Sequence, residues 1–282
     1  MYFLFANPQK PETIRAAQEV AELLLDAGER VVLDRWLHNI LHLGDDGYLN
    51  QLSHDNTKAI ISFGGDGTLL RTLPTAARMN IPVLGINMGR VGFLLETDRT
   101  DIAQAIERLR SRQYTLEKRN MLSARVQGVD ETFLVMNDVV LCRGGNPSSI
   151  SVDAYANDEL VYATHGDGII VCTATGSTGY CLSAGGPVLH PGLRNIIMLP
   201  ICTHKAQQLP IVFDEEVRIR LRCESLPGRT QQVIFDGQHI IEMQGITEVY
   251  VQRATYSAQF IRFEPQHFFT RLRLKQAEWS GK

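Results

Sequence analysis

The segment that most restricts the fold of this chain is a glycine-rich turn between an apolar run and a helical pattern. Residues 59–63 are almost entirely apolar, which is typical of a buried strand. Gly64, Gly65 and Gly67 then surround Asp66, and glycines here predict backbone angles that other residues avoid. Residues 68–77 repeat with the period of one helix face. Because a helix start leaves backbone N–H groups without partners, the turn predicts a phosphate-binding position.

Asp66 is the unexpected residue of this turn. A carboxylate repels phosphate, so its position favours acceptance of a proton from a hydroxyl group or coordination of a metal ion. The alternative is structural: a tight strand–helix turn in which Asp66 caps the helix. Since glycine turns are common, the turn alone leaves both alternatives open.

The pattern of apolar residues divides the chain into two parts. Up to about residue 115, strands expected at 2–6, 30–33, 59–63 and 81–87 alternate with helices expected at 12–27, 68–77 and 100–112. This alternation predicts a parallel α/β sheet. Between residues 123 and 251, short apolar runs with period two, such as 133–141, are separated by turn residues and predict a β-rich second domain. The mixed stretch 36–56 permits no assignment.

The last part of the chain, residues 267–279, predicts a terminal helix. Phe268 and Phe269 lie on its apolar side, whose packing partner the spacing does not reveal. Arg271, Arg273 and Lys275 alternate with apolar residues and predict a solvated face.

Composition narrows the classes of partner and compartment. The chain has 282 residues, 44% of them hydrophobic and 21% charged, as in ordinary globular proteins. A net charge of −3 gives no broad basic field, so nucleic acid is not an expected partner. No apolar run approaches the roughly 18 residues that a membrane-spanning helix needs, so no membrane-spanning helix is expected. The five cysteines form no CxxC pair, which favours a reduced, cytoplasmic chain without a zinc site.

A second glycine-rich stretch, residues 167–187, repeats the layout of an acid, an apolar strand and small residues. Thr175, Ser177 and Thr178 offer hydroxyl groups that could hold ribose or phosphate oxygens, and Tyr180 could stack on a base. The alternative is a turn-rich corner of the β domain with a buried tyrosine.

Taken together, these motifs resemble those of a known family. The chain carries, in the order found in NAD kinases, GGDGTLLR (64–71), NMGRVGFL (87–94), RNML (119–122), NDVVL (137–141), DGIIVCTATGSTGYCLSAGGPVLHP (167–191), PICTH (200–204) and DGQ (236–238). GGDGT alone is a weak signal, because diacylglycerol, sphingosine and phosphofructo-kinases have similar turns. The long string of residues 167–191 is highly specific, and the resemblance covers nearly the whole chain.

The resemblance implies a fold and a reaction. The fold is an α/β N-terminal domain, residues 1–118 joined by a returning C-terminal segment 256–282, and an all-β NAD-binding domain, residues 119–255. The reaction is phosphorylation of the adenosine ribose 2′-hydroxyl of NAD by ATP, or in some members by polyphosphate, with Mg²⁺ or Mn²⁺. NAD would lie in the cleft between the domains, and the family usually forms homodimers or homotetramers.

The resemblance also implies roles for individual residues. Asp66 corresponds to the proton acceptor, Asn137 and Asp138 to the pair that holds adenosine, and His165 and Asp167 to positions near the second nucleoside. No metal ligand is assigned. The residues implied to contact NAD or ATP are Gly64, Gly65, Gly67, Thr68, Asn137, Asp138, Ser148, His165, Asp167, Thr178, Gly179, Tyr180, Cys181, Leu182, Ser183 and Gln238.

The sequence departs from the family pattern at several of these positions. Gly179 replaces a common Ala, and Ala174 replaces a common Pro, which predicts a looser loop. Asp138 is one methylene shorter than the usual Glu, and His165 stands where Arg is frequent, so contact there is expected to depend on pH near neutrality.

Two other functions remain open at this point. A lipid or sugar kinase would share Asp66 but has no reason to carry the Asn137–Asp138 pair. A non-catalytic sensor would bind NAD or NADP without moving a phosphate, and the retained Asp66 argues against it.

Overall fold

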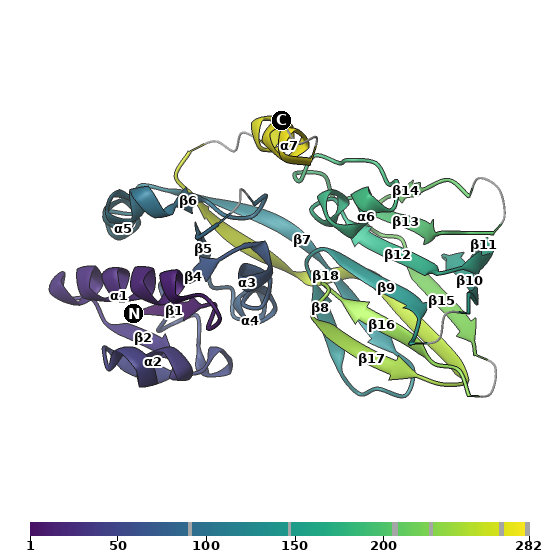
Figure 1. Ribbon diagram of the computed structural model, residues 1–282, viewed down its shortest axis with the longest axis horizontal. Helices are drawn as coiled ribbons and strands as arrows, with labels where there is room; N and C mark the ends of the chain where they lie inside the picture. Colours follow the sequence, from purple (N-terminus) through teal and green to yellow (C-terminus); the bar gives the residue numbers. More distant parts are fainter. Residues whose placement is uncertain (90–91, 146–147, 205–207, 226–227, 265–267, 280–282) are drawn as a thin grey trace. The chain divides into compact units, whose positions relative to one another are not determined.

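The computed structural model describes the chain except for residues 90–91, 146–147, 205–207, 226–227, 265–267 and 280–282. Residues 90–91 of the NMGRVGFL motif and the first residue of the expected C-terminal helix, 267, therefore lie outside the described residues. The chain divides into two compact units (Figure 1). Unit 1 comprises Met1–Lys118 and Ser257–Lys282, and unit 2 comprises Arg119–Tyr256.

Unit 1 is built on a parallel sheet, as the alternating pattern predicts. Its strands lie in the order β5, β4, β1, β2, β3, with β6 beside β5. Every residue of β1, β4 and β5 is buried, because both faces of the sheet are covered. The strands are β1 (Tyr2–Ala6), β2 (Val31–Asp34), β3 (Asp45–Gly47), β4 (Ala59–Gly64), β5 (Val83–Asn87) and β6 (Thr97–Asp98).

The helices of unit 1 bury their apolar faces against this sheet. Buried residues of α1, α2 and α5 form one cluster with those of the strands. Pro11 begins α1, where its missing N–H has no partner to lose, and Gly28 follows the helix with φ 75°. The elements are α1 (Pro11–Asp26), α2 (Arg35–Leu41), α3 (Asp66–Leu70), α4 (Leu73–Arg78) and α5 (Ile102–Arg110), with 3₁₀ turns η1 (Leu49–Gln51) and η2 (Arg99–Asp101).

The helix expected over residues 68–77 is interrupted. It forms two short helices, α3 and α4, that are separated at Arg71 and Thr72. Pro74 lies in the first turn of α4, where its lack of an N–H is tolerated; within one continuous helix it would remove a hydrogen bond. The Thr72 hydroxyl donates to the carbonyl of Leu69 at 2.8 Å. The predicted spacing of the buried residues was therefore correct, whereas the prediction of one continuous helix was wrong.

Unit 2 consists of antiparallel strands in two sheets. One sheet contains β10 (Ile150–Ala156), β11 (Glu159–Gly166), β15 (Ile219–Glu224), β18 (Ile246–Arg262), β7 (Thr115–Val126) and β8 (Thr132–Val135). The other contains, in order, β14 (Ile211–Phe213), β13 (Ile196–Ile201), β12 (Gly168–Thr173), β9 (Asp138–Arg143), β16 (Gln231–Phe235) and β17 (His239–Met243). The predicted β-rich domain is confirmed, and β7 and β18 each contain residues of both units.

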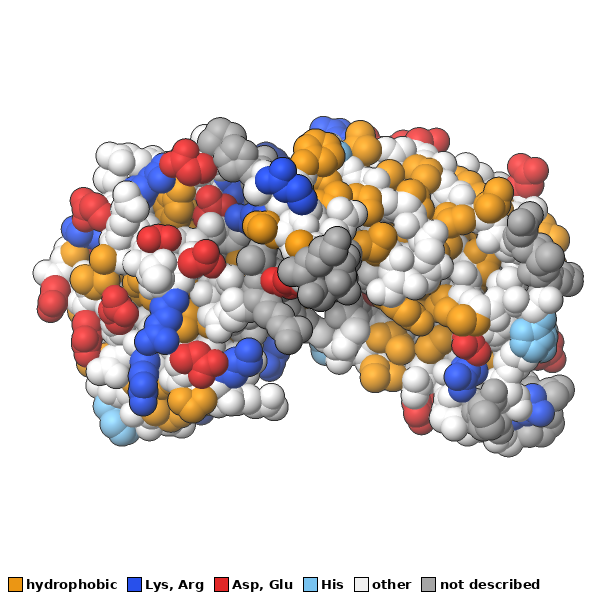
Figure 2. Space-filling view, turned by 45° about the horizontal axis from the view of Figure 1, so that its top comes forward, with side chains coloured by type: hydrophobic (Ala, Val, Ile, Leu, Met, Phe, Trp, Pro, Cys, Tyr) orange, Lys and Arg blue, Asp and Glu red, His pale blue; other side chains and the backbone are white. Residues whose placement is uncertain are grey.

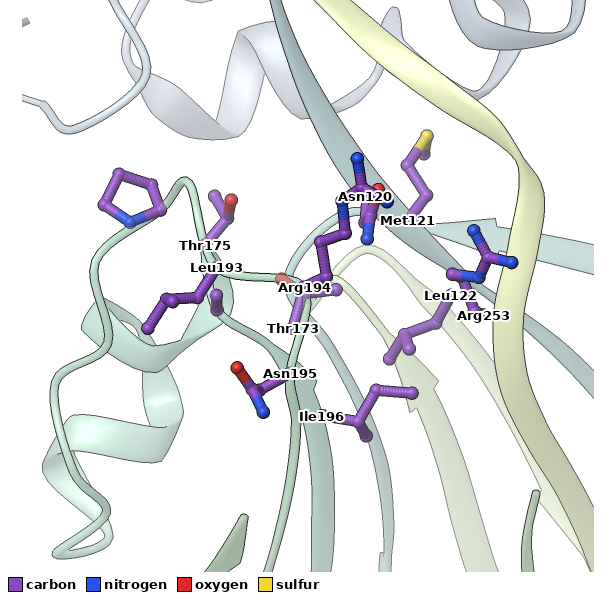
Figure 3. Close-up of a pocket in the computed structure, with 12 residues that line it drawn as sticks. Asn120, Met121, Leu122, Thr173, Thr175, Leu193, Arg194, Asn195, Ile196 and Arg253 are labelled. Carbon is purple, nitrogen blue, oxygen red and sulfur yellow. The ribbon is translucent and has the colours of Figure 1, made fainter. Parts of the chain in front are cut away.

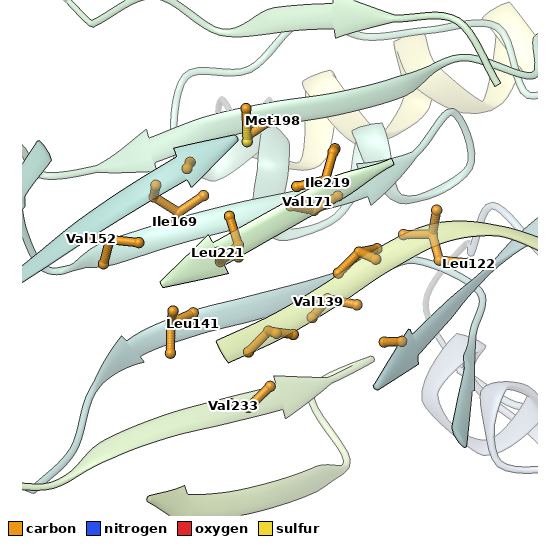
Figure 4. Packing of buried hydrophobic residues seen from close by; sticks show 14 of the residues in the cluster. Leu122, Val139, Leu141, Val152, Ile169, Val171, Met198, Ile219, Leu221 and Val233 are labelled. Carbon is orange, nitrogen blue, oxygen red and sulfur yellow. The ribbon is translucent and has the colours of Figure 1, made fainter. Parts of the chain in front are cut away.

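The core of unit 2 lies between its two sheets (Figure 4). Val139 and Leu141 of β9 and Ile219 and Leu221 of β15 belong to one cluster. Alternate residues point inward, because successive side chains of a strand face opposite sides. The outer face of the second sheet is covered by the segment that contains η3 (Gly176–Thr178) and α6 (Tyr180–Ser183), whose Cys181 packs on Cys172 and Ile170.

The apolar run of residues 133–141 is divided between two strands, β8 and β9. The break lies at Met136 and Asn137, whose backbone amides donate to the carboxylate of Asp236. A side chain distant in the sequence thus takes the donors that a continuous strand would use in its ladder.

The end of the chain returns to unit 1, as the family resemblance implies. Phe260 of β18 pairs in parallel with Val83 of β5. The terminal helix, α7 (Phe268–Trp279), packs Phe268 against Phe93, with ring centroids 6.1 Å apart. This contact supplies the partner that the helical spacing left unidentified.

Two surface properties follow from the described residues. None of their helices is both long and apolar enough to cross a membrane. On the face shown in Figure 2, acidic and basic side chains are intermingled.

Candidate functional site

The glycine turn of unit 1 holds Asp66 directly after β4. Its carboxylate accepts hydrogen bonds from two successive backbone amides, those of Phe93 (2.8 Å to Oδ2) and Leu94 (3.2 Å to Oδ1). Gly65, not Asp66, is the N-cap of α3, and so the structural alternative for Asp66 is wrong. Because each carboxylate oxygen can accept more than one hydrogen bond, the two amides orient the group without exhausting its capacity.

The glycines around Asp66 leave room for other atoms, and they do not adopt unusual backbone angles. Gly64, Gly65 and Gly67 are not among the glycines with positive φ, so that expectation is wrong. A Cβ on Gly64 would lie 2.3 Å from Oγ1 of Thr68, whereas a Cβ on Gly65 or Gly67 would meet nothing within 4 Å. Gly64 is therefore required for packing, and the other two leave open room over the turn.

A second loop of unit 1 begins where the neighbouring strand ends. Gly64 of β4 is in register with Asn87 of β5, so both loops leave the same edge of the sheet. The Asn87 amide donates to Asp98 Oδ1 at 2.8 Å, and its oxygen accepts from Gly89 N at 3.1 Å. Gly92 lets this loop approach Asp66, since a Cβ there would lie 2.2 Å from Asp66 Oδ1.

In unit 2, Asn137 and Asp138 are held by a residue from a different hairpin. The carboxylate of Asp236 accepts from the backbone amides of Met136 (2.9 Å), Asn137 (2.6 Å) and Asp138 (3.2 Å). Asp236 and Gly237 have φ of 50° and 65°, which form the left-handed turn between β16 and β17. The Asp236 carboxylate therefore fixes the backbone that carries the predicted adenosine pair.

Asp138 is a buried carboxyl group. Burial, followed by the charge of Asp236, raises the pKa of Asp138 to about 7. Burial also raises the pKa of Asp236, although its three backbone hydrogen bonds act in the opposite direction. Near neutral pH, Asp138 is therefore divided between a carboxylate and a carboxylic acid, which can donate a hydrogen bond.

The segment after β12 is fastened to the same backbone. Thr173 N donates to the carbonyl of Asn137 at 2.9 Å, and the Thr173 hydroxyl donates to Met136 O at 2.7 Å. Gly176 must be glycine, because a Cβ would lie 2.1 Å from the carbonyl oxygen of Asn137. Gly179 lies near the pair as well, with the position of its Cβ 3.8 Å from Asp138 Oδ2 and 4.0 Å from Asn137 Nδ2.

The hydroxyl groups of this segment are not equally accessible to a ligand. Ser177 is fully buried, and its hydroxyl donates to Ala174 O at 2.6 Å and accepts from Leu189 N at 3.0 Å. Thr178 is half-buried, with a bond of 3.2 Å to Thr175 O. Tyr180 is 47% exposed, so the alternative of a buried tyrosine is wrong. Ser177 thus stabilises the loop, whereas Tyr180 presents its ring to solvent.

Cys181 is buried, while its neighbours Leu182 and Ser183 are partly buried and exposed. Cys181 forms a hydrogen bond with Cys172 of β12; this bond, followed by burial, raises the pKa of Cys172. The five cysteines are all free thiols. The Cys172–Cys181 contact fills the space between α6 and the sheet.

His165 and Asp167 belong to a separate group of polar side chains. The His165 ring bonds to Ser149 Oγ through Nε2 (2.6 Å) and to Ser151 Oγ through Nδ1 (3.1 Å). Asp167 Oδ1 accepts from Arg143 Nε at 2.8 Å. Ser148, which precedes Ser149, is partly buried. These partners of His165 and Asp167 were not predicted from the sequence.

The structure places the two groups at opposite ends of β9 and β12. Asp138 pairs with Cys172 at one end, and Cys142 pairs with Gly168 at the other. Four residues of strand separate these ends by roughly 13 Å. Burial, followed by the charges of neighbouring groups that include Asp167 and Asp138, raises the pKa of Tyr180. Gln238 is exposed in the turn after Asp236, near the Asp138 end.

A small cavity lies beside the segment that follows β12 (Figure 3). It has a volume of about 10 Å³ and is lined by Thr173, Ala174 and Thr175, together with Asn120, Arg194 and Arg253. A cavity of this size holds about one water molecule and not a nucleotide. The carboxylate of Glu215 contacts three of the lining side chains: it accepts a hydrogen bond from Asn120 (3.2 Å) and forms ion pairs with Arg194 (3.3 Å) and Arg253 (3.3 Å).

A larger groove of about 490 Å³ lies along β15 and β18. Its lining includes Arg125, Arg220 and Tyr250, and none of the predicted site residues. Cavity size alone therefore does not indicate the predicted site.

Comparison with known proteins places this geometry in a family. The model of the ATP-NAD kinase N-terminal domain matches residues 3–114, and that of the ATP-NAD kinase C-terminal domain matches residues 136–263. A solved NAD kinase from Archaeoglobus fulgidus, in complex with ATP, has a TM-score of 0.76 at 26% identity, covering 97% of this chain and 99% of the other. A yeast NADH kinase solved with NADH shares the fold, with a TM-score of 0.84 at 23% identity over 96% of this chain and 85% of the other.

The fold is thus that of kinases built from an α/β part and a β part. The NAD kinase of Heliobacterium modesticaldum is 35% identical over 277 residues, 96% of either chain. That of Methanothermobacter thermautotrophicus is 33% identical over 271 residues, 95% of this chain and 93% of the other. The chain belongs to the NAD kinase family.

Proposed function

We propose that this chain transfers the γ-phosphate of ATP to the 2′-hydroxyl of the adenosine ribose of NAD, giving NADP. The observation that carries the proposal is the carboxylate of Asp66, oriented by the amides of Phe93 and Leu94 beside a turn with open space at Gly65 and Gly67. Full-length similarity to NAD kinases supports the choice of substrates.

Asp66 is proposed to accept the proton of the ribose hydroxyl. The pKa of such a hydroxyl lies far above neutrality, so an aligned carboxylate is needed as the oxygen attacks phosphorus. Positioning and neutralisation of phosphate charge supply most of the rate in phosphoryl transfer. Gly65 and Gly67 support the approach of the donor phosphates to the backbone, since neither position has an atom within 4 Å of where a Cβ would be.

The adenosine of NAD is proposed to bind at Asn137 and Asp138, with the segment from Thr178 to Ser183 around it. The Asp236 carboxylate and Thr173 fix this backbone before any ligand binds, which favours binding by a preformed site. His165, Asp167 and Ser148 lie near the far end of β9, where an extended dinucleotide could place its second nucleoside.

A magnesium or manganese ion is expected with ATP. Among the described residues, no group of three or more His, Cys, Asp or Glu side chains could hold a metal ion. We propose that the phosphates of ATP carry the ion. The assignment of a homodimer or homotetramer, and of the cytoplasm, is likewise proposed. Five free thiols support a reducing compartment.

One assay tests the function. Purified protein is incubated with ATP, Mg²⁺ and NAD, and NADP is measured with a dehydrogenase that accepts only NADP. We expect NADP to form, and Asp66→Asn to lower kcat by roughly 10²–10⁴-fold while weakening NAD binding much less. Tight NAD binding without NADP would favour a sensor, and phosphorylation of a lipid or sugar instead of NAD would favour the other kinase classes.

A further inference from the structure

The loop of residues 92–96 in unit 1 is held from both sides of its backbone. On one side, the amides of Phe93 and Leu94 donate to Asp66. On the other side, two arginines from the C-terminal part of the chain donate to its carbonyls. Arg262 Nη1 bonds to Leu94 O at 3.0 Å, and Arg271 Nη1 bonds to Leu95 O and, at 3.5 Å, to Phe93 O. One peptide group connects Arg271 with Asp66: the Phe93 carbonyl accepts from Arg271, and the Leu94 N–H of the same peptide donates to Asp66. The carbonyls of Leu94 and Leu95 belong to the next two peptide groups, which the arginines hold in place.

Arg271 differs from Arg273, its neighbour on α7. Its guanidinium is largely withdrawn from solvent, and this burial, followed by the charge of Arg262, lowers its pKa. Arg273, on the same helix, is exposed. The predicted solvated face is therefore wrong for Arg271, which turns inward to the loop. Phe268 packs on Phe93 and brings the start of α7 to this position.

Burying a guanidinium opposes folding unless its hydrogen bonds compensate. Here its acceptors are the carbonyls of Leu95 and Phe93, and the Phe93 carbonyl shares a peptide group with the Leu94 amide that donates to the predicted catalytic carboxylate. A hydrogen-bonded peptide that accepts at its carbonyl donates more strongly at its amide, because such chains polarise one another. The arrangement thus favours one orientation of the Asp66 carboxylate.

We propose that Arg271 is a positioning residue for the phosphoryl transfer. It acts through the Phe93–Leu94 peptide group and by fixing the loop at the Leu95 carbonyl, so that the loop amides hold the Asp66 carboxylate in the orientation needed to meet the ribose hydroxyl. The proposal rests on the proposed function of Asp66. It gives the C-terminal helix, which contains no predicted site residue, a part in catalysis.

The first test separates positioning from a structural role. Arg271→Met keeps the aliphatic stem and removes the guanidinium, Arg271→Lys keeps the charge, and Arg273→Met is the matched control on the exposed face of the same helix. We expect Arg271→Met to lower kcat by roughly 10–100-fold, as misplacement of a catalytic group does, with the KM for NAD and for ATP nearly unchanged. Arg271→Lys should retain more of kcat, and Arg273→Met should behave as wild type. Wild-type kcat in Arg271→Met, or a loss confined to KM, would overturn the proposal.

The second test asks whether Arg271 acts through Asp66. If it does, Arg271→Met should reduce kcat no further in an Asp66→Asn background, whereas independent contributions would multiply. Amide hydrogen exchange of Phe93 and Leu94 should also be faster in Arg271→Met. Multiplying effects or unchanged exchange would contradict the inference while the wild-type chain still forms NADP. A wild-type chain that forms no NADP would instead remove the proposed function itself, together with the inference built on it.

Discussion

The backbone amide of Asn137 donates a 2.6 Å hydrogen bond to the carboxylate of Asp236, a residue 99 positions later in the chain. The same carboxylate accepts from Met136 and Asp138, so one side chain holds three successive donors at the break between β8 and β9. The predicted adenosine pair thus depends on a residue to which sequence comparison gave no role.

Replacement of Asp236 should therefore damage both stability and NAD binding. Asp236→Asn substitutes an NH₂ group for one acceptor oxygen and directs it toward backbone donors. We expect the free energy of unfolding to fall by about 1–3 kcal/mol, the usual effect of leaving buried donors unpaired, and the KM for NAD to rise more than that for ATP. Urea denaturation and steady-state kinetics measure the two effects. Asp130→Asn, in an exposed turn of the same unit, is the control; equal behaviour of the two variants would contradict this account.

The raised pKa of Asp138 predicts a pH dependence of stability. Burial and the charge of Asp236 raise it to about 7, above the ordinary value, so the folded state binds a proton that the unfolded chain has released. This contribution to stability is fully present below the unfolded pKa and is lost as the pH rises through 7. From pH 5 to pH 8, we expect wild type to lose about 1–3 kcal/mol relative to Asp138→Asn. Parallel urea titrations of both proteins at pH 5, 6, 7 and 8 measure it, and identical slopes would argue against a raised pKa.

Two neighbouring glycines should respond differently to the same added methyl group. Gly64→Ala forces its Cβ against Thr68 and should lower the free energy of unfolding by about 1–3 kcal/mol, as overpacking does. Gly65 has extended backbone angles and open space, so Gly65→Ala should keep the wild-type Tm. If phosphates approach this turn, Gly65→Ala should nevertheless raise the KM for ATP. Thermal unfolding and ATP titration distinguish the effects, and an unaltered KM in Gly65→Ala would speak against phosphate approach at this position.

Arg262 should be a strong determinant of the stability of unit 1. It is 3% exposed and bonds to Glu96 (3.1 Å) and Glu117 (2.7 Å) as well as to the loop carbonyl of Leu94. Arg262→Met leaves buried carboxylates without this partner and should lower the free energy of unfolding by about 3–5 kcal/mol.

The matched control for Arg262 is Arg30→Met, which removes an exposed pair with Asp45. That change should alter the free energy of unfolding by less than about 1 kcal/mol. Chemical denaturation of both variants measures the contrast, and a similar small effect of the two substitutions would refute the assigned importance of burial.

Local patterns predicted the fold class well. The buried strand before Gly64, the helix ended by Gly28 and the period-two runs of unit 2 were all confirmed. Each depends on neighbours in sequence, whose spacing and backbone preferences act before any tertiary contact forms. Local patterns were insufficient where distant groups intervene: the apolar run of residues 133–141 is interrupted by contacts of Asp236.

The candidate site shows the same contrast between features set by neighbouring residues and features set by distant ones. The family resemblance pointed to Asp66, Asn137 and Asp138 as candidates, but it could not reveal that amides of the 92–94 loop orient Asp66, or that Arg271 holds that loop from the other side. It assigned His165 and Asp138 to different parts of the dinucleotide, but the distance between their ends of the strands follows only from the register of β9 and β12.

The sequence by itself therefore determined the fold class and most of the elements outside residues 36–56, which family the chain resembles and which carboxylate is the candidate base, because motif and period are local properties. Tertiary structure alone decided the pKa of Asp138, the orientation of Asp66 and the inward turn of Arg271. These depend on burial and on hydrogen bonds between segments far apart in the chain, and only the folded backbone brings such segments together.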